Sequence, residues 1–201
     1  MSVLVGRPVP DFTAPAVLAD GKIVGDFSLS NAIKGKYAVV VFYPLDFTFV
    51  CPSELIALDH RCQDLHKKGV EVIAVSVDSH FTHNAWRNTA IKDGGIGPVK
   101  YTMVADINHK ITQAYGVEHP EAGVAFRATF LIDKKGFVRH EVVNDLPLGR
   151  NMDELLRMVD ALEFFDEHGE VCPAGWQKGK AGMKADPKGV AEYLAQHSDK
   201  L

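Results

Sequence analysis

Two short, almost wholly apolar runs rich in β-branched residues lie at 37–43 and 70–77. Such runs are typical of strands that are buried on both faces of a sheet. Between them, residues 52–69 carry apolar side chains at helical spacing, open with a proline and close on two lysines and Gly69. These are the expected signals for the start and the end of a helix. The order strand, helix, strand with short connections predicts a right-handed βαβ unit.

The rest of the chain predicts further elements of both kinds. We expect helices over 80–92, 108–115, 152–165 and 188–196, and strands over 102–105, 128–132 and 137–143. The segment Asp133-Lys-Lys-Gly136 predicts a hairpin turn between the last two strands, with its glycine in the left-handed conformation. Parallel strands followed by an antiparallel hairpin and a closing helix predict an α/β fold, a thioredoxin-like sandwich with insertions.

The amino-acid composition changes after His168, where glycine and proline interrupt a lysine-bearing stretch. We therefore expect one domain over 1–167 and a C-terminal arm over 168–201. The arm contains Cys172-Pro-Ala-Gly-Trp176, and a tail that served only solubility would not carry that tryptophan.

Composition narrows the class of protein. The chain has 201 residues, of which 46% are hydrophobic and 24% charged, and this suits one soluble domain with a sizeable core. A net charge of −4 argues against binding nucleic acid by neutralising its phosphates. No apolar run approaches the roughly 18 residues of a membrane span, and the first residues lack the pattern of a secretion signal. We expect a cytoplasmic protein with neither membrane nor nucleic-acid partners.

Three cysteines are too few for a disulfide scaffold, and an odd number cannot all pair within one chain. Cys51 directly precedes the helix that Pro52 opens, where free N–H groups and the helix dipole favour a thiolate. This position favours a reactive thiol over a packed one. Cys62 lies on the apolar face of the same helix, where packing is the better interpretation. A metal site with His66 has the right spacing but lacks convincing further ligands.

Several motifs occur in a fixed order around two of the cysteines. They are Phe42-Tyr-Pro44, Asp46-Phe-Thr48, Cys51-Pro-Ser-Glu54, Ser79-His-Phe81, His83-Asn-Ala-Trp86, Gly94-Gly-Ile-Gly97, Phe126-Arg127 and Gly169-Glu-Val-Cys172-Pro-Ala-Gly-Trp176. From about residue 3 to residue 194 the chain resembles the typical two-cysteine peroxiredoxins, the family that includes the peroxidase subunit of alkyl hydroperoxide reductase. The resemblance implies a thioredoxin-like fold with peroxiredoxin insertions and a thiol peroxidase, an oxidoreductase of antioxidant defence and redox homeostasis.

The resemblance also implies roles for single residues. Cys51 would attack the peroxide, and Cys172 would be the resolving cysteine, which the partner subunit of a head-to-tail homodimer supplies. Pro44 would shield the thiolate, Thr48 would hydrogen-bond the peroxide, and Arg127 would bind both thiolate and peroxide.

Further residues would support these five. Glu54 would orient Arg127, and Tyr43 and Trp86 would complete the surroundings of the site. Without the resemblance, Arg127 would count as an exposed charge at a strand end and Trp86 as an ordinary core residue.

The family also implies the partners. The substrates would be hydrogen peroxide and organic hydroperoxides, and the reductant would be thioredoxin or a flavoprotein disulfide reductase. No cofactor and no metal would be needed. Separation along the chain does not distinguish an intrachain from an intersubunit Cys51–Cys172 bridge. The composition of the arm and the family favour the intersubunit bridge, in a homodimer that assembles into a decameric ring.

One motif departs from the family pattern. Gly94-Gly-Ile-Gly97 resembles an element of peroxiredoxins that are easily overoxidised, whose other half is a Tyr-Phe pair in a C-terminal helix. Here that pair is Tyr193-Leu194, which keeps apolar bulk but lacks the second aromatic ring. We expect intermediate sensitivity to overoxidation, because a looser cover lets the helix of Cys51 unwind sooner.

Other functions fit the sequence less well. A disulfide oxidoreductase of the thioredoxin kind needs a second cysteine that Cys51-Pro-Ser-Glu54 lacks. A cysteine hydrolase needs a histidine base, and no motif places a histidine beside Cys51. A chaperone-like role of the assembled protein would be additional to peroxidase activity, and it would survive the substitution Cys51→Ser.

Overall fold

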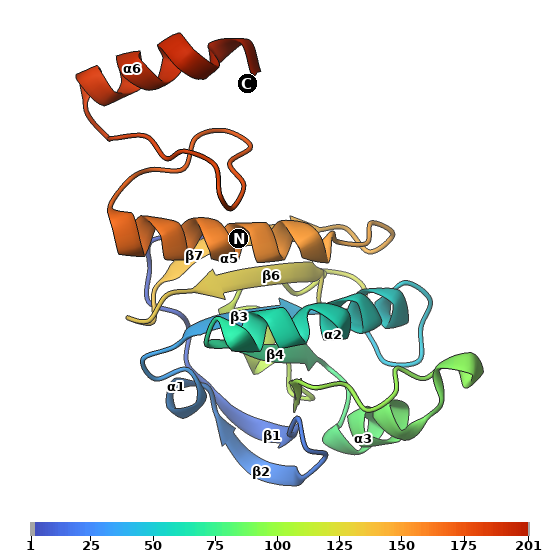
Figure 1. Cartoon of the computed structure of the whole chain (residues 1–201). Coiled ribbons are helices and arrows are strands. Elements are labelled where there is room, and N and C mark those ends of the chain that lie inside the picture. Colours follow the sequence, from blue (N-terminus) through green and yellow to red (C-terminus); the bar gives the residue numbers. More distant parts are fainter. Residues whose placement is uncertain (1–2, 201) are drawn as a thin grey trace. The chain divides into compact units, whose positions relative to one another are not determined.

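The computed structural model describes residues 3–200, and its contacts divide the chain into two compact units, Met1–Met152 and Asp153–Leu201 (Figure 1). The division falls at the start of helix α5 (Met152–His168). The sequence predicted a boundary between residues 167 and 168, at the end of this helix. By its contacts, α5 therefore groups with the residues that follow it.

One seven-stranded mixed sheet forms the centre of the first unit, as an α/β sandwich predicts. Across the sheet the strands run β2 (Ile23–Ser28), β1 (Thr13–Val17), β5 (Thr102–Ala105), β4 (Val70–Ser76), β3 (Tyr37–Phe42), β6 (Arg127–Ile132) and β7 (Val138–Asn144). Strand β4 pairs in parallel with β3 and β5, and the other neighbours are antiparallel. The predicted βαβ unit and the late hairpin are both confirmed. Strands β3 and β6 are buried at every residue. Burial on both faces explains the continuous apolar sequence of β3, whereas β6 also buries Arg127 and Thr129.

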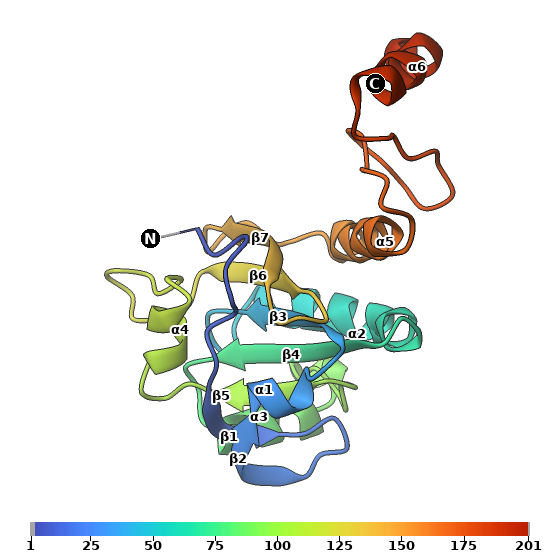
Figure 2. The ribbon, with the colours of Figure 1, turned by 90° about the vertical axis from the view of Figure 1, so that its left-hand side faces the viewer.

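Helices cover both faces of this sheet, as Figure 2 shows for α2 and α4. Helix α2 (Cys51–Lys67) contacts β4 and buries one side of its cylinder. The buried residues of α2 are Cys51, Glu54, Leu55, Leu58, Cys62 and Leu65. On the opposite face, Ile111 of α4 (Lys110–Ala114) shares a core cluster with Val40 and Phe42 of β3. The sheet is thus held from both sides, and the loops at its strand ends have a rigid base.

Sequence patterning missed the first hairpin, β1 and β2, and the short helix α1 (Leu29–Ala32) that follows it. Strand β1 contains Pro15, and its register with β2 shifts between Ala14 and Ala16, on either side of that proline. Strand β2 contains Gly25 and lies at the edge of the sheet. Proline and glycine weaken the strand signal in a sequence, and bulges and edges are the places where sheets tolerate them.

Helix α3 (His80–Asn88) ends four residues before the predicted end, and a short 3-10 turn (Ile91–Asp93) follows. The amide of Gly95 donates to the carbonyl of Ala90 at 3.1 Å, so the chain folds back on itself here. A Cβ atom at Gly95 would clash with the backbone carbonyl of Thr89. The close approach therefore requires glycine at this position.

Helix α4 also differs from its predicted range of 108–115. The carboxylate of Asp106 accepts hydrogen bonds from the amides of Ile111 and Thr112, at 3.0 and 2.7 Å. His109 before the helix has a positive φ of 61°. The hydrogen bonds to Asp106 and the left-handed conformation of His109 together set the start of the helix at Lys110.

The second unit contains α5, a folded segment and α6 (Pro187–His197). Helix α6 begins one residue before its predicted start, because Asp186 accepts from the amide of Gly189 at 2.7 Å and Pro187 opens the helix. Between the helices, Val171 pairs with Met183 through their backbones, and Trp176 is only 4% exposed. The arm is therefore folded. Within residues 3–200, no helix is long and apolar enough to cross a membrane.

We expect Cys62 to be unreactive in the folded protein. Its side chain is fully buried, and this burial, with a smaller effect of the charge of Asp59, raises the pKa of its thiol to about 12. At neutral pH the thiol is protonated, so iodoacetamide should modify it only after unfolding in urea. Peptide mass spectrometry measures this, with Cys62 in the urea-unfolded protein as the control. Modification of Cys62 in the folded protein as fast as in the unfolded one would contradict the expectation.

Candidate active site

Cys51 is the first residue of α2, one residue before the predicted start of that helix. The loop of residues 43–50 connects it to the end of β3. Val50 before the helix makes no side-chain cap, and Pro52 has no N–H of its own to satisfy. The cysteine side chain is fully buried. The predicted place of this thiol, at a helix N-terminus, is confirmed.

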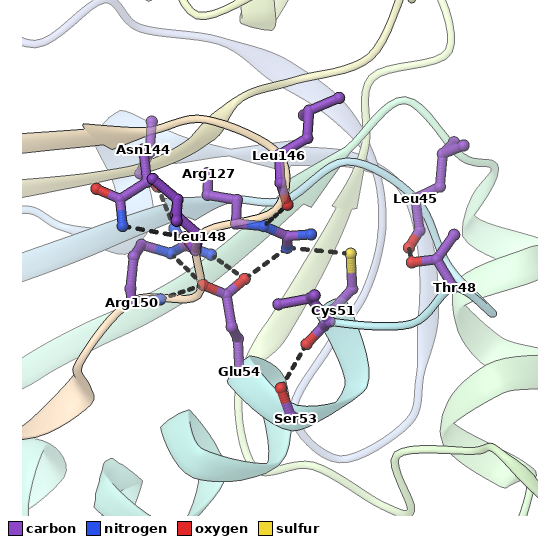
Figure 3. A network of polar contacts seen from close by, with 12 residues as sticks. Leu45, Thr48, Cys51, Ser53, Glu54, Arg127, Asn144, Leu146, Leu148 and Arg150 are labelled. Carbon is purple, nitrogen blue, oxygen red and sulfur yellow. Dashed lines mark hydrogen bonds and ion pairs between the residues drawn. The ribbon is translucent and has the colours of Figure 1, made fainter.

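Arg127, the first residue of β6, brings a buried positive charge to Cys51 (Figure 3). Its Nη1 donates to the Sγ of Cys51 at 3.4 Å, and its Nε donates to the carbonyl of Leu146 at 2.6 Å. The arginine side chain is only 5% exposed, so it is not the exposed charge that sequence alone would suggest. A desolvated guanidinium in this position stabilises a thiolate, and also a negative oxygen close to it.

Glu54 lies one helical turn after Cys51 and binds two arginines at once. Arg127 Nη1 donates to its Oε2 at 2.8 Å. Arg150 donates to Oε1 from its backbone N at 2.7 Å and its Nε at 2.9 Å, and to Oε2 from its Nη2 at 3.0 Å. Glu54 therefore contacts Arg127 directly, as a role in orienting that arginine requires. The buried cluster of Glu54, Arg127 and Arg150 therefore contains two positive charges and one negative charge.

These contacts also set the ionisation of Glu54. Burial alone would raise the pKa of its carboxyl, but the hydrogen bonds and charge of Arg150, and the charge of Arg127, lower that pKa overall. Burial alone would lower the pKa of Arg127, but its hydrogen bond to Cys51 and the charges of Cys51 and Glu54 raise it overall. Glu54 and Arg127 are therefore both ionised at neutral pH.

Sequence reasoning missed Arg150. Its Nη1 also donates to the carbonyl of Ala128 in β6 at 2.6 Å, so it ties the loop before α5 to the sheet. Glu54 is the one residue that could have pointed to it, because a buried carboxylate needs partners at all its acceptor positions and Arg127 alone does not fill them. Nothing in sequence spacing selects Arg150 as the partner, since it lies 96 residues from Glu54.

Thr48 and Pro44 belong to the loop in front of Cys51. The hydroxyl of Thr48 donates to the carbonyl of Leu45 at 2.8 Å, which leaves its oxygen free to accept. In the view of Figure 3, Thr48 lies on the other side of the Cys51 sulfur from Arg127. Pro44 is buried at the end of β3. The loop thus offers an acceptor on one side of the sulfur, and the arginine offers donors on the other.

Tyr43, the first residue of this loop, and Trp86 of α3 both contact other residues of the loop. Tyr43 donates its hydroxyl to Asp46 Oδ1 at 2.6 Å, and His83 Nδ1 lies 2.7 Å from Asp46 Oδ2. The ring of Trp86 packs against Tyr43 and Phe47, with centroid distances of 6.1 and 5.8 Å. Burial raises the pKa of both Tyr43 and Asp46. These residues form a buried support for the loop that carries Thr48.

Cys172 belongs to the second unit. Its thiol donates to the carbonyl of Ala161 in α5 at 3.4 Å, and burial raises its pKa despite the opposing charge of Arg157. All three cysteines are free thiols. Across residues 3–200, no group of three or more histidine, cysteine or acidic side chains is arranged to hold a metal ion.

Known proteins resemble this chain over almost all of its length. A profile of the AhpC/TSA family matches residues 5–141, and a profile of the C-terminal domain of 1-Cys peroxiredoxin matches residues 161–196. Alkyl hydroperoxide reductase C of Helicobacter pylori is 56% identical over 199 residues, which are 99% of this chain and 100% of that protein. Peroxiredoxin-2 of Macaca fascicularis is 50% identical over 194 residues, 96% of each chain.

A solved structure agrees with these sequences. The reduced 2-Cys peroxiredoxin of Plasmodium vivax superposes with a TM-score of 0.92 at 46% identity, covering 96% of this chain and 100% of that one. Enterococcus faecalis AhpC superposes with a TM-score of 0.78 at 37% identity, covering 86% and 100%. The chain therefore belongs to the AhpC/TSA family of peroxiredoxins, and the assignment made from its cysteine motifs is confirmed.

Proposed function

We propose that the chain is a thiol peroxidase that reduces hydrogen peroxide and organic hydroperoxides to water and alcohols. The observation that carries the proposal is the contact between the buried Arg127 guanidinium and the sulfur of Cys51 at the start of α2. The names of relatives that match over the full length, alkyl hydroperoxide reductase C and peroxiredoxin, support it.

In the first step, the Cys51 thiolate attacks one peroxide oxygen. An S–O bond forms and the O–O bond breaks, so the sulfur becomes a sulfenic acid. The second oxygen departs with the electron pair, takes up a proton and leaves as water or an alcohol. Arg127 donates to the peroxide and to the charge that develops on the leaving oxygen, and Thr48 accepts from the peroxide O–H. Pro44 shields the thiolate from water.

A thiolate alone does not account for fast peroxide reduction. Lowering a thiol pKa from about 8.5 to about 6 raises the thiolate fraction about thirtyfold at neutral pH. The same change lowers intrinsic nucleophilicity on the order of tenfold. The net gain is only a few-fold, so alignment of the peroxide and stabilisation of the leaving oxygen must supply the rest. The donors of Arg127 and the acceptor of Thr48 suit that task.

In the second step, the thiol of Cys172 from the partner subunit condenses with the sulfenic acid. A disulfide forms and one water leaves, before a second peroxide can oxidise the sulfur further. An external dithiol, thioredoxin or a flavoprotein disulfide reductase, then reduces the disulfide and is itself oxidised. The arm from residue 168 onward delivers Cys172, in a homodimer that assembles into a decameric ring. The cycle suits the cytoplasm, where reductants keep such disulfides transient.

Substituting the two reactive cysteines should affect peroxide consumption and disulfide formation in different ways. Cys51→Ser should abolish peroxide consumption, because the nucleophile is gone. Cys172→Ser should consume a first equivalent of peroxide without forming a disulfide-linked dimer, and should then consume more only as the sulfenic acid is oxidised to sulfinic acid. A peroxide assay and non-reducing electrophoresis measure both effects, with Cys62→Ala as the matched control that keeps turnover and dimer. A normal disulfide-linked dimer in Cys172→Ser would overturn the assignment.

Arg127→Gln should slow the first step by about 10²- to 10³-fold, the usual cost of removing one aimed donor from a developing negative oxygen. Rapid mixing with peroxide measures the second-order rate of Cys51 oxidation. Arg139→Gln is the control. Arg139 lies in the neighbouring strand β7 and pairs with Asp133 at 3.1 Å, so this substitution should leave the rate unchanged. A first step of unaltered rate in Arg127→Gln would remove this residue from the mechanism.

Leu194→Phe should make the enzyme more sensitive to overoxidation. Restoring the Tyr-Phe pair tightens the cover that the family pattern predicts, and an aromatic contact of about 0.5–1.5 kcal/mol corresponds to a roughly two- to tenfold shift. The measurement is the peroxide concentration that half-inactivates the enzyme during turnover. Leu194→Met is the control without a ring. Equal sensitivity of the unsubstituted protein and Leu194→Phe would contradict intermediate sensitivity.

A further inference from the structure

Cys172 occupies a resting position in this structure. Its thiol donates to the carbonyl oxygen of Ala161, a backbone group of α5, at 3.4 Å. Burial raises the pKa of the thiol, which is therefore protonated at neutral pH. To bond to another sulfur, Cys172 must leave this hydrogen bond and lose its proton. The segment that carries it, residues 172–176, must therefore separate from α5.

Trp176 anchors the same segment four residues later. Its ring packs on Phe164 of α5 with a centroid distance of 4.8 Å, and its Nε1 donates to the carbonyl of Lys180 at 3.1 Å. At 4% exposure it is the most deeply buried side chain of the segment. The segment is thus attached to α5 at both ends, by a weak thiol hydrogen bond and by an aromatic contact.

Arg157 adds a third and directional attachment. Its Nη1 donates to the backbone carbonyl of Trp176 at 2.7 Å. Its Nε and Nη2 donate to the two carboxylate oxygens of Glu154, at 2.6 and 2.7 Å, one turn earlier in α5. The bidentate pair fixes the plane of the guanidinium and aims the remaining donor at the segment.

Lys178, two residues after this segment, makes a much weaker ionic contact with α5. Lys178 Nζ lies 3.7 Å from Asp160 Oδ1, and the lysine side chain is 69% exposed. Exposed pairs at such distances contribute little, because water and salt screen them. This contact provides a comparison, since it joins α5 to the chain just after the segment.

We propose that Arg157 is a positioning residue for the resolving step, one that holds residues 172–176 against α5 and so sets how fast Cys172 is released to the sulfenic acid. The proposal rests on the proposed function, because it concerns the second step of that cycle. Arg157 touches neither the peroxide nor Cys51 in this role. It acts through the backbone of Trp176.

The release of this segment decides between two fates of the sulfenic acid. Condensation with the Cys172 thiol gives a disulfide and water. Reaction with a second peroxide gives a sulfinic acid and releases a further water or alcohol. Because the two reactions compete, faster release of Cys172 raises the share of disulfide at a given peroxide concentration. Arg157 thereby tunes sensitivity to overoxidation from within the arm.

The test is Arg157→Gln, studied by rapid mixing of the reduced full-length protein with hydrogen peroxide. The first phase, oxidation of Cys51, should be unchanged. The second phase, disulfide formation, should be about three- to tenfold faster. The substitution removes the charge-assisted hydrogen bond between Arg157 and the Trp176 carbonyl, and this loss favours the released position of Cys172. The sulfinic share, measured by mass spectrometry at fixed peroxide, should fall in proportion. A role in general stability alone would not separate the two phases.

Two further variants keep the test decisive. Arg157→Lys retains the charge but loses the bidentate pair, and should show a smaller acceleration of the second phase. Lys178→Gln breaks the exposed pair and should leave both phases as they are. A second phase that is unchanged or slower in Arg157→Gln and Arg157→Lys overturns the proposal; a slower one would indicate that Arg157 assists through its charge on the thiol.

The outcomes also separate this proposal from the proposed function. If the unsubstituted protein forms no Cys51–Cys172 disulfide on treatment with peroxide, the cycle itself is refuted. If it forms that disulfide and Arg157→Gln forms it at the same rate, only the role of Arg157 is refuted. In a Cys172→Ser background, Arg157→Gln should have no effect on sulfinic acid formation, and an effect there would count against action through Cys172.

Discussion

The active site depends on one carboxylate that is shared by two buried guanidiniums. Burying charge is costly unless every polar atom finds a partner, and the contacts of Glu54 with Arg127 and Arg150 meet that demand. The balance is nevertheless unequal, because two positive charges face one negative charge. The excess positive charge lies beside the Cys51 sulfur, where it favours an anion. The same group of charges thus compensates the buried carboxylate and supplies the positive charge that the proposed thiolate requires.

Sheet topology brings these groups together from distant parts of the chain. Strands β3 and β6 are antiparallel neighbours, and Phe42 at the end of β3 pairs with Ala128 near the start of β6. Arg127 therefore lies beside the loop that leads from β3 into α2. Arg150 is tied to β6 through the carbonyl of Ala128 and to α2 through Glu54. The sheet register, rather than any local motif, sets the distance between the arginine and the thiol.

The contrast between predicted and unpredicted features has physical reasons. Continuous apolar runs predicted the central strands, because such runs are typical of strands that are covered on both faces. The hairpin of β1 and β2 gave no such signal, since Pro15 and Gly25 are tolerated at a bulge and at an edge. Pro52 marked the helix start and hence the place of Cys51. Arg127 was identified only through resemblance, and Arg150 not at all, because a partner in space leaves no periodic trace in the sequence.

The close approach of Gly95 to the carbonyl of Thr89 bears on how such sequences are compared. Any side chain at this position would collide with backbone, whatever the protein does with peroxide. Natural selection for a properly terminated α3 is thus sufficient to retain the glycine. Gly95 is therefore a poor diagnostic marker for overoxidation among relatives of this chain.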